Sequence, residues 1–240
     1  MEKLSKPSVI FFDLDNTLYD YESAHKKAID SVEKKVATLL GIEKEEFHNL
    51  YAEAKNLIKL TAGKTASSHN RLLYFQKLLE LKGFGQQVLT ALDLHQTYWN
   101  NFLLEAELYE GVLELFDELR IHDIKIGLIT DLTIDIQFRK LVKFGIHQFF
   151  DSIVTSEEVN FDKPNSKCFE LALTKLNGMY DLEKRIWMIG DDEKKDIIGS
   201  KKSINAITFL KKSNKREIST TADYQFSNFQ ELQKILRHAG

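Results

Sequence analysis

A short stretch near the start of the chain, residues 8–17, reads SVIFFDLDNT. Residues 8–12 form a brief, apolar run rich in β-formers, which stops at acidic residues and the turn-like pair Asn16-Thr17. A run of this length, bounded by turn residues, is typical of a buried β-strand. The sequence therefore predicts a strand over residues 8–12, with two aspartates directly at its carboxyl end.

The same pattern recurs in the second half of the chain, where apolar strand-like runs alternate with segments of helical periodicity. We expect further strands at residues 125–130, 152–155, 185–189 and 206–210. Helical spacing is present at residues 112–119, 136–144, 168–176, 196–202 and 229–237. Alternation with short turns indicates a parallel sheet covered by helices on both faces. We therefore expect an α/β fold with a Rossmann-like, three-layer core.

The segment that follows the first strand has a different character. Between residues 21 and 102 apolar side chains recur at helical spacing in four blocks, and glycines separate the blocks. Because the first strand belongs with the later ones, this helical block must be an insertion. We expect residues 1–19 and 104–240 to form a discontinuous α/β domain and residues 20–103 to form an inserted, all-helical domain.

Composition limits the class of protein. The 240 residues are 43% hydrophobic and carry a formal net charge of −3, which gives no indication of nucleic acid or an anionic membrane as a partner. A single cysteine, Cys168, forms no intrachain disulfide and suits a reducing cytoplasm. The start of the chain lacks the pattern of a signal peptide, and no segment has the roughly 20 apolar residues of a membrane span. We expect a soluble, cytoplasmic protein.

The candidate functional residues follow the predicted strands. In an open parallel sheet, ligands bind beyond the carboxyl ends of the strands. The residues at or just after four strand ends are Asp13, Thr130, Thr155 and Asp191. We therefore expect acidic and hydroxyl side chains to converge at one edge of the sheet.

Asp13 and Asp15 are two residues apart, so in an extended segment both side chains face one small volume. Two crowded carboxylates repel each other unless a cation lies between them or one holds a proton. A hard divalent ion such as Mg²⁺ would serve. One carboxylate could then attack phosphorus while the other handles a proton. From residues 13–17 alone, a solvated turn explains the pattern as well as a catalytic site does.

Three other elements have both a functional and a structural interpretation. Asp191 and Asp192 follow a glycine after an apolar strand and could complete a metal site, or could simply begin a helix. Lys163 could bind a phosphoryl oxygen and stabilise a nucleophile, although most lysines are exposed. Thr130 could donate a hydrogen bond to phosphate or cap the next helix.

These elements occur in the order Asp-x-Asp-x-Thr, Thr, Lys-Pro and Gly-Asp-Asp-x-x-x-Asp, each at a strand end or in the loop after it. In that order, with the helical insertion between the first two, the chain resembles the haloacid dehalogenase-like (HAD) hydrolase superfamily. The insertion is similar to that superfamily's C1-type cap. The matching pieces are FFDLDNTL, GLIT, NFDKPNSKCFELAL and MIGDDEKKDIIG.

The resemblance implies roles for the acidic residues. Asp13 would be the nucleophile that forms an aspartyl-phosphate, and Asp15 the general acid that protonates the leaving oxygen and later activates water. Mg²⁺ would be held by Asp13, Asp191 and the backbone carbonyl of Asp15.

The resemblance also implies a phosphate site. Thr130 and Lys163 would bind the phosphoryl group, with Lys163 taking part in catalysis. Asp196 would be the acid that holds Lys163, and Asp192 either a metal ligand or a group behind the ligands.

The identity of residue 15 selects among the reactions of the superfamily. Its dehalogenases and phosphonate-cleaving members lack an aspartate there, whereas phosphatases and phosphomutases keep it, because an alkoxide leaving group needs a proton. The resemblance therefore implies a Mg²⁺-dependent phosphomonoester hydrolase whose cap encloses a small phosphorylated metabolite. A phosphomutase, or a catalytically silent binding protein on the same fold, are the alternatives.

Asp131 departs from the family pattern, because many relatives have asparagine after the threonine. It could face the cap side and select a cationic or hydroxyl-rich leaving group, or it could cap the helix that begins near Thr133. Trp187 is expected in the core. Tyr98 and Trp99 could line the substrate pocket, but core packing is the preferred interpretation, and the basic segment 211–216 is expected to be a solvated loop.

Overall fold

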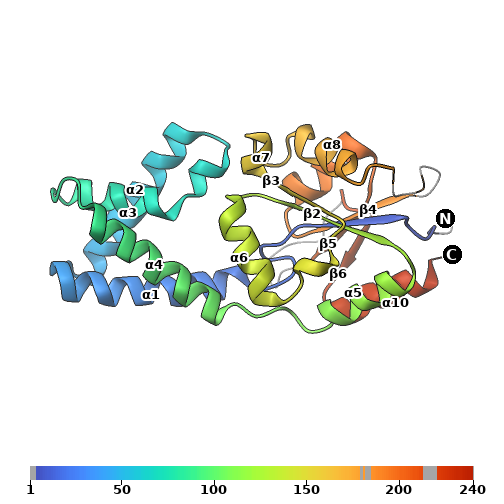
Figure 1. The fold of residues 1–240 in the computed structure, drawn as a ribbon, viewed down its shortest axis with the longest axis horizontal. Helices are drawn as coiled ribbons and strands as arrows, with labels where there is room; N and C mark the ends of the chain where they lie inside the picture. The colour runs from blue at the N-terminus through green and yellow to red at the C-terminus, as the bar shows by residue number, and fades with distance from the viewer. Residues whose placement is uncertain (1–3, 179–180, 182–184, 213–220, 240) are drawn as a thin grey trace. The chain divides into compact units, whose positions relative to one another are not determined.

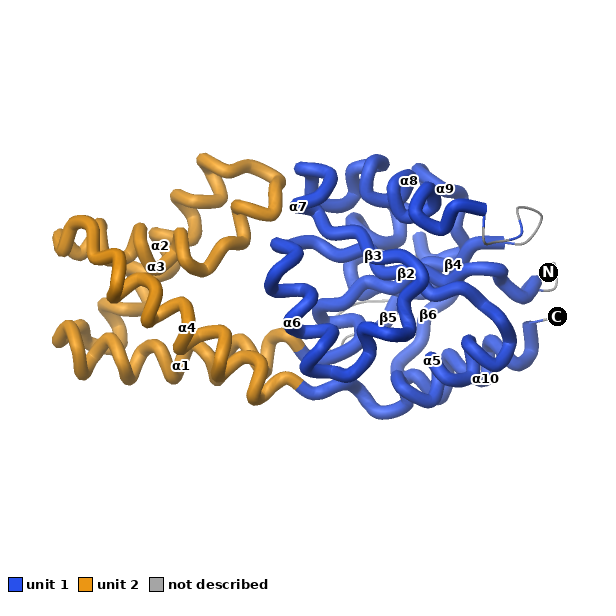
Figure 2. Tube along the Cα trace, viewed as in Figure 1, with its two compact units in different colours: residues 1–20, 107–240 blue, residues 21–106 orange. Residues whose placement is uncertain are grey.

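The computed structural model describes residues 4–178, 181, 185–212 and 221–239 (Figure 1). The chain forms two compact units, residues 1–20 with 107–240, and residues 21–106 (Figure 2). The first boundary falls one residue after the predicted 19, and the second three residues after the predicted 103. The helices expected between residues 21 and 102 all lie in the second unit.

A parallel sheet forms the centre of the first unit. Within the described residues it has six strands in the order β3-β2-β1-β4-β5-β6. Their bounds are β1 Val9–Phe12, β2 Lys125–Thr130, β3 Ser152–Thr155, β4 Ile186–Gly190, β5 Ile207–Lys211 and β6 Tyr224–Phe226. Phe12 in β1 is level with Leu128 in β2 and Ile189 in β4, so the next residues along these strands meet at one edge.

Helices cover both faces of this sheet (Figure 1). They are α5 Val112–Ile121, α6 Ile134–Phe144, α7 Ser156–Val159, α8 Ser166–Lys175, α9 Gly199–Ile204 and α10 Phe229–His238. Phe11 of β1 shares a buried cluster with Cys168 and Phe169 of α8. Phe12 points the other way, and its ring meets that of Phe116 in α5 with centroids 5.1 Å apart. Because successive strand residues face opposite sides, this alternation gives three layers and confirms the predicted α/β class.

The segment after β4 differs from its prediction. In place of one helix over residues 196–202, a π-helical turn Glu193–Ile198 (η3) continues into α9. The carboxylate of Asp192 accepts the amides of Lys194 and Lys195, and the carbonyl of Asp192 accepts from the amides of both Asp196 and Ile197. The helical turns therefore begin three residues earlier than the apolar periodicity indicates.

Two further short elements of the first unit were not predicted. These are the three-residue strand β6, next to β5, and the single turn of α7 after β3. Elements this short hold too few residues for a periodicity to develop. A three-residue 3-10 turn, η2 His147–Phe149, follows α6.

The second unit, whose residues are all described, is helical throughout. It contains α1 Tyr21–Leu40, α2 Lys44–Ala62, the 3-10 turn η1 Ala66–His69, α3 Arg71–Leu81 and α4 Val88–Glu105. Its core confirms the expectation for Tyr98 and Trp99, which are buried and whose rings meet at right angles. Trp187 is likewise buried in β4 of the first unit.

In the described part of the chain, no helix combines the length and the apolar composition needed to cross a lipid bilayer.

Candidate active site

Asp13 lies immediately after β1 and is 6% exposed. Its backbone amide continues the sheet by donating to the carbonyl of Ile189 at 2.9 Å, which fixes where the side chain starts. Asp13 Oδ2 accepts a hydrogen bond from Thr17 Oγ1 at 2.9 Å, and Oδ1 lies 2.6 Å from Lys163 Nζ. The loop after β1 therefore presents a buried, oriented carboxylate.

Lys163 is the cation of this site. Its buried Nζ donates to Asp13 Oδ1 at 2.6 Å, to Asp196 Oδ1 at 2.7 Å and to the carbonyl of Ile129 at 2.9 Å. Burial by itself would lower the pKa of Lys163, but the carboxylates of Asp13 and Asp196 raise it well above its usual range. The lysine therefore stays charged and links the end of β1 to the turn after β4.

The two carboxylates that pair with Lys163 belong to a group of three. Among the described residues, Asp13, Asp191 and Asp196 each offer an oxygen, and these oxygens lie within 4.8 Å of one another. Burial raises the pKa of Asp13 well above its usual range against the pull of Lys163, and Asp196 and Asp191 raise it further. A divalent cation would relieve this repulsion, so the donor set fits Mg²⁺.

Asp196 has other partners than a cation. Its Oδ1 accepts from Lys163 Nζ, and its Oδ2 accepts from the amide of Asp192 at 3.0 Å. Gly190 makes room for it, because a Cβ on Gly190 would stand 2.3 Å from Asp196 Oδ2. Asp192 has its Oδ1 engaged as the cap of η3. Asp191, by contrast with Asp192, belongs to the described carboxylate group whose oxygens lie within 4.8 Å of one another, so it could complete a metal site with Asp13.

Asp15 has a separate set of partners. Its Oδ1 lies 2.7 Å from Lys140 Nζ and accepts a short hydrogen bond from the hydroxyl of Tyr19. Its Oδ2 is 3.4 Å from Gln137 Nε2. The two aspartates of the motif are therefore paired with different lysines, Asp13 with Lys163 and Asp15 with Lys140.

Gln137 and Lys140 were not anticipated from the sequence. Both side chains are polar, yet they are fully buried on α6, on the same face as the apolar Ile136 and Leu141. A glutamine and a lysine three residues apart on an otherwise apolar helical face are the signal that could have identified them.

Thr130 ends β2, is buried, and has its Oγ1 2.5 Å from Gln137 Nε2. It does not cap the following helix, because the N-cap residue of α6 is Thr133. The side chain instead belongs to the same hydrogen-bonded group as Asp15, through Gln137.

Asp131 does not cap α6, so that expectation is wrong. Its Oδ1 accepts from the backbone amide of Lys163 at 2.9 Å, and its Oδ2 lies 2.6 Å from Lys195 Nζ. The first amide of α6, that of Ile134, donates instead to Glu157 at 2.8 Å. Asp131 therefore braces the loop that carries Lys163, and Lys195 balances its charge.

Lys211 corrects the expectation of a solvated loop over residues 211–216. It ends β5, and its ammonium lies 3.7 Å from the centroid of the Tyr109 ring and 3.2 Å from the carbonyl oxygen of Asn16. Burial lowers its pKa, although Asp191 and Asp20 act in the opposite direction. Residues 213–216 of the predicted loop lie outside the described residues.

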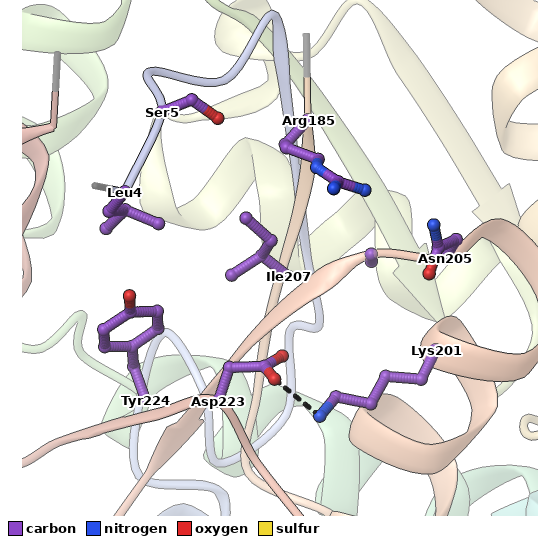
Figure 3. A pocket seen from close by; sticks show the side chains of 9 residues that line it. Leu4, Ser5, Arg185, Lys201, Asn205, Ile207, Asp223 and Tyr224 are labelled. Carbon is purple, nitrogen blue, oxygen red and sulfur yellow. Dashed lines mark hydrogen bonds and ion pairs between the residues drawn. The ribbon is translucent and has the colours of Figure 1, made fainter. Parts of the chain in front are cut away.

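The first unit also has a cavity of about 390 Å³ at the amino ends of the strands, whereas the candidate active site lies at their carboxyl ends. Figure 3 shows its lining, which includes Arg185, Ile207 and Tyr224 at the amino ends of β4, β5 and β6. The ammonium of Lys201 in this lining is paired with Asp223. None of the residues predicted to act in chemistry lies there.

The chain is similar in sequence to a known protein family and to characterised enzymes. The family model described as haloacid dehalogenase-like hydrolase matches residues 10–209. The chain is 34% identical over 194 residues to the ribulose-1,5-bisphosphate 5-phosphatase of Halopiger xanaduensis, covering 80% of each chain. It is 31% identical over 238 residues to the glyceraldehyde 3-phosphate phosphatase of Methanocaldococcus jannaschii, covering 95% of this chain and 96% of the relative.

Solved structures share the fold. A HAD phosphatase from Thermococcus onnurineus superimposes with a TM-score of 0.75 at 24% identity, covering 97% of this chain and 99% of the other. A 2-haloacid dehalogenase from Pseudomonas syringae gives a TM-score of 0.70 at 18% identity, covering 96% and 98%. Phosphatases and a dehalogenase thus share this architecture, so the fold alone does not select the reaction.

Proposed function

We propose that this chain hydrolyses small phosphorylated metabolites through an aspartyl-phosphate on Asp13 and that it uses Mg²⁺. The chain belongs to the haloacid dehalogenase-like hydrolase family and is a phosphatase of that family. The observation that carries the proposal is Asp13 itself, a buried carboxylate 2.6 Å from a lysine that also holds Asp196. A turn aspartate with only a structural role has no need of such an environment.

Asp13 is oriented for nucleophilic attack. Thr17 and Lys163 each donate to one of its oxygens, so the carboxylate has little freedom to rotate. In the first step a carboxylate oxygen forms a bond to phosphorus, and the bond from phosphorus to the leaving oxygen breaks. The leaving oxygen takes its electron pair and receives a proton from Asp15. In the second step water, losing a proton to Asp15, attacks phosphorus and releases inorganic phosphate and free Asp13.

Lys163 and Thr130 are the proposed contacts for the transferred phosphoryl group. Lys163 Nζ lies 2.6 Å from Asp13 Oδ1, so its charge is close to where negative charge moves during transfer. Thr130 Oγ1 stands at the end of β2, the strand beside β1. Asp196 keeps Lys163 in place, and Asp131 holds the backbone on which Lys163 stands.

Asp13, Asp191 and the backbone carbonyl of Asp15 would hold Mg²⁺. The bound ion would neutralise charge on the transferring phosphoryl group. In its absence the pKa of Asp13 is raised, first by burial and then by Asp196 and Asp191. A bound cation would oppose this shift and favour the ionised, nucleophilic form of Asp13.

Sugar phosphates are the proposed substrate class. The two relatives named above are phosphatases of a pentose bisphosphate and of a triose phosphate, and both match along most of their length. We further propose that the helical segment, residues 20–103, is the cap domain, because C1 caps in this family are inserted at this place in the chain.

A phosphate-release screen with Mg²⁺ tests the proposal. The panel should contain triose and pentose phosphates, nucleoside monophosphates, phosphoglycolate and para-nitrophenyl phosphate. Release of inorganic phosphate from at least one sugar phosphate is expected. Isomer formation without free phosphate would identify a phosphomutase instead, and no release with or without metal across a broad pH range would favour a catalytically silent protein.

The nucleophile is tested by Asp13→Asn. The amide is a poor nucleophile, so turnover should fall by roughly 10⁴-fold or more, a loss of the size seen when a catalytic nucleophile is removed. The fold should persist, because the substitution removes a buried charge without changing shape. Asp117→Asn, at an exposed position on α5, is the matched control and should keep full activity. Retained turnover in Asp13→Asn would exclude the nucleophile assignment.

A further inference from the structure

Lys140 is a fully buried lysine for which the family resemblance gives no role. It stands in the middle of α6, its side chain is 0% exposed, and its ammonium lies 2.7 Å from Asp15 Oδ1. The ammonium is also 5.7 Å from the centroid of the Tyr19 ring. Burying an ammonium costs several kcal/mol, and a buried ion pair often gives no net gain in stability over apolar side chains of the same volume. Stability is therefore a weak explanation for this pair.

The two oxygens of Asp15 are in different environments. Oδ1 accepts from Lys140 Nζ and from the hydroxyl of Tyr19, so both strong donors are on one oxygen. Oδ2 has a single contact among the described residues, with Gln137 Nε2 at 3.4 Å, which is at the limit of hydrogen bonding. Oδ1 is thus tied down, while Oδ2 keeps room for a proton.

Gln137 limits how far Oδ2 can move. Its Nε2 lies 2.5 Å from Thr130 Oγ1 and 2.8 Å from the carbonyl oxygen of Asp131. The amide is therefore held by the end of β2, whether or not it bonds to Asp15. Asp15 accordingly lies between a strong clamp on one oxygen and a fixed neighbour beside the other.

We propose that Lys140 is the positioning residue for Asp15, and that with Tyr19 it holds Oδ1 so that Oδ2 is the oxygen that transfers protons. This inference rests on the proposed phosphatase mechanism. In the first step the proton on Oδ2 passes to the leaving oxygen as its bond to phosphorus breaks, and Asp15 becomes a carboxylate. In the second step Oδ2 takes a proton from the attacking water, and the starting state returns.

The test uses how strongly a leaving group depends on a proton donor. An alkyl phosphate needs its leaving oxygen protonated, whereas 2,4-dinitrophenyl phosphate releases a stable anion and does not. The value of kcat/KM reports the steps up to departure of the leaving group, so it isolates the acid step. A positioning role therefore predicts unequal losses, while a purely structural role predicts equal ones.

The experiment compares Lys140→Met with the wild type on both substrates, using the best sugar phosphate of the screen. General acid catalysis contributes typically 10²–10⁴-fold, so loss of positioning should lower kcat/KM on the sugar phosphate by roughly tenfold to a hundredfold. On 2,4-dinitrophenyl phosphate the loss should stay below about threefold, because no proton is required for departure. Lys143→Met, at an exposed position on the same helix, should match the wild type on both.

Tyr19→Phe gives a second, milder variant in case Lys140→Met does not fold. It removes only the hydroxyl on Oδ1 and keeps the ring that packs on Phe144 at a centroid distance of 4.9 Å. Like Lys140→Met, it should lower kcat/KM more on the sugar phosphate than on 2,4-dinitrophenyl phosphate. Equal losses on both substrates, or no loss in either variant, would overturn the inference. A wild-type enzyme inactive on both substrates would instead overturn the proposed function.

Discussion

Gly190 shows how one residue can constrain the candidate site. It ends β4, and the carboxylate of Asp196 packs directly against its backbone. Asp196 is itself fixed by Lys163 Nζ at 2.7 Å and by the amide of Asp192 at 3.0 Å. A side chain at position 190 would therefore displace the acid that holds the central lysine.

We predict that Gly190→Ala is damaging in two ways. The new Cβ would stand 2.4 Å from Asp196 Cβ, so Asp196 must move. Overpacking of this kind costs about 1–3 kcal/mol, and the shift of Lys163 should lower kcat by at least an order of magnitude. Thermal unfolding and phosphate release measure the two effects.

Gly127→Ala is the matched control for Gly190→Ala. It lies in the neighbouring part of the same sheet, and its added Cβ would stand 2.3 Å from the Phe11 ring. It should lose stability by a similar amount while the surviving folded protein keeps its kcat. Equal kcat in both variants would show that Asp196 does not need its present position.

At the scale of the elements, the polar residues at the strand ends were predictable from the sequence, whereas the buried polar residues of the predicted helix α6 were not. Asp13, Thr130 and Asp191 could be placed because parallel strands bring their carboxyl ends to one edge, and the polar residues follow apolar runs. The sequence did not identify Lys140 as a site residue, because its partner Asp15 lies 125 residues away. Periodicity alone does not show which polar residue a helix buries.

Asp131 shows a second limit of the sequence. Its position before a helix suggested a cap, a contact between near neighbours in the chain. Its actual partners are the amide of Lys163, in the loop before α8, and the ammonium of Lys195, in the helical turn η3. A carboxylate at a strand end has several loops within reach, and tertiary structure decides which one it binds.

His25 in α1 gives a prediction for the helical unit. Burial, followed by the charges of Arg71 and Lys55, lowers the pKa of His25 to about 3. Its Nδ1 lies 2.7 Å from the hydroxyl of Tyr98. Because the pKa in the folded state is below the usual value of about 6.5, the unfolded state binds the extra proton. His25 should therefore lower the free energy of unfolding progressively as the pH falls from about 6.5 towards 3.

The measurement is the free energy of unfolding by denaturant at several pH values between 7 and 4, for the wild type and His25→Gln. In His25→Gln, the change in unfolding free energy per pH unit should be smaller than in the wild type by up to about 1.4 kcal/mol, the contribution of one proton. His147→Gln, at an exposed position, is the control and should keep the wild-type slope. An unchanged slope in His25→Gln would mean that another group carries the acid sensitivity.

At the scale of the whole molecule, the buried carboxylates connect the chemistry of the site to the stability of the protein. Burial first, and then Asp196 and Asp191, raise the pKa of Asp13 despite Lys163, so without metal the ionisation of Asp13 is less favourable in the folded state than in the unfolded chain. For such a raised pKa, the stabilising contribution is present below about pH 4 and is lost as the pH rises through the folded-state value. Added Mg²⁺ should reverse this loss.

We therefore predict that Mg²⁺ raises the melting temperature at neutral pH and has less effect at acidic pH, where protons compete for Asp13. At a hundred times its dissociation constant, a ligand that binds only the folded state adds about 2.7 kcal/mol. Asp191→Asn should remove most of this gain, because it removes the charge of a proposed ligand next to Asp13. Asp192→Asn should retain the gain, since Asp192 Oδ1 caps η3 and an amide oxygen can replace it there. Calorimetry with and without Mg²⁺ measures both, and a reversed order of the two variants would move the metal ligand from Asp191 to Asp192.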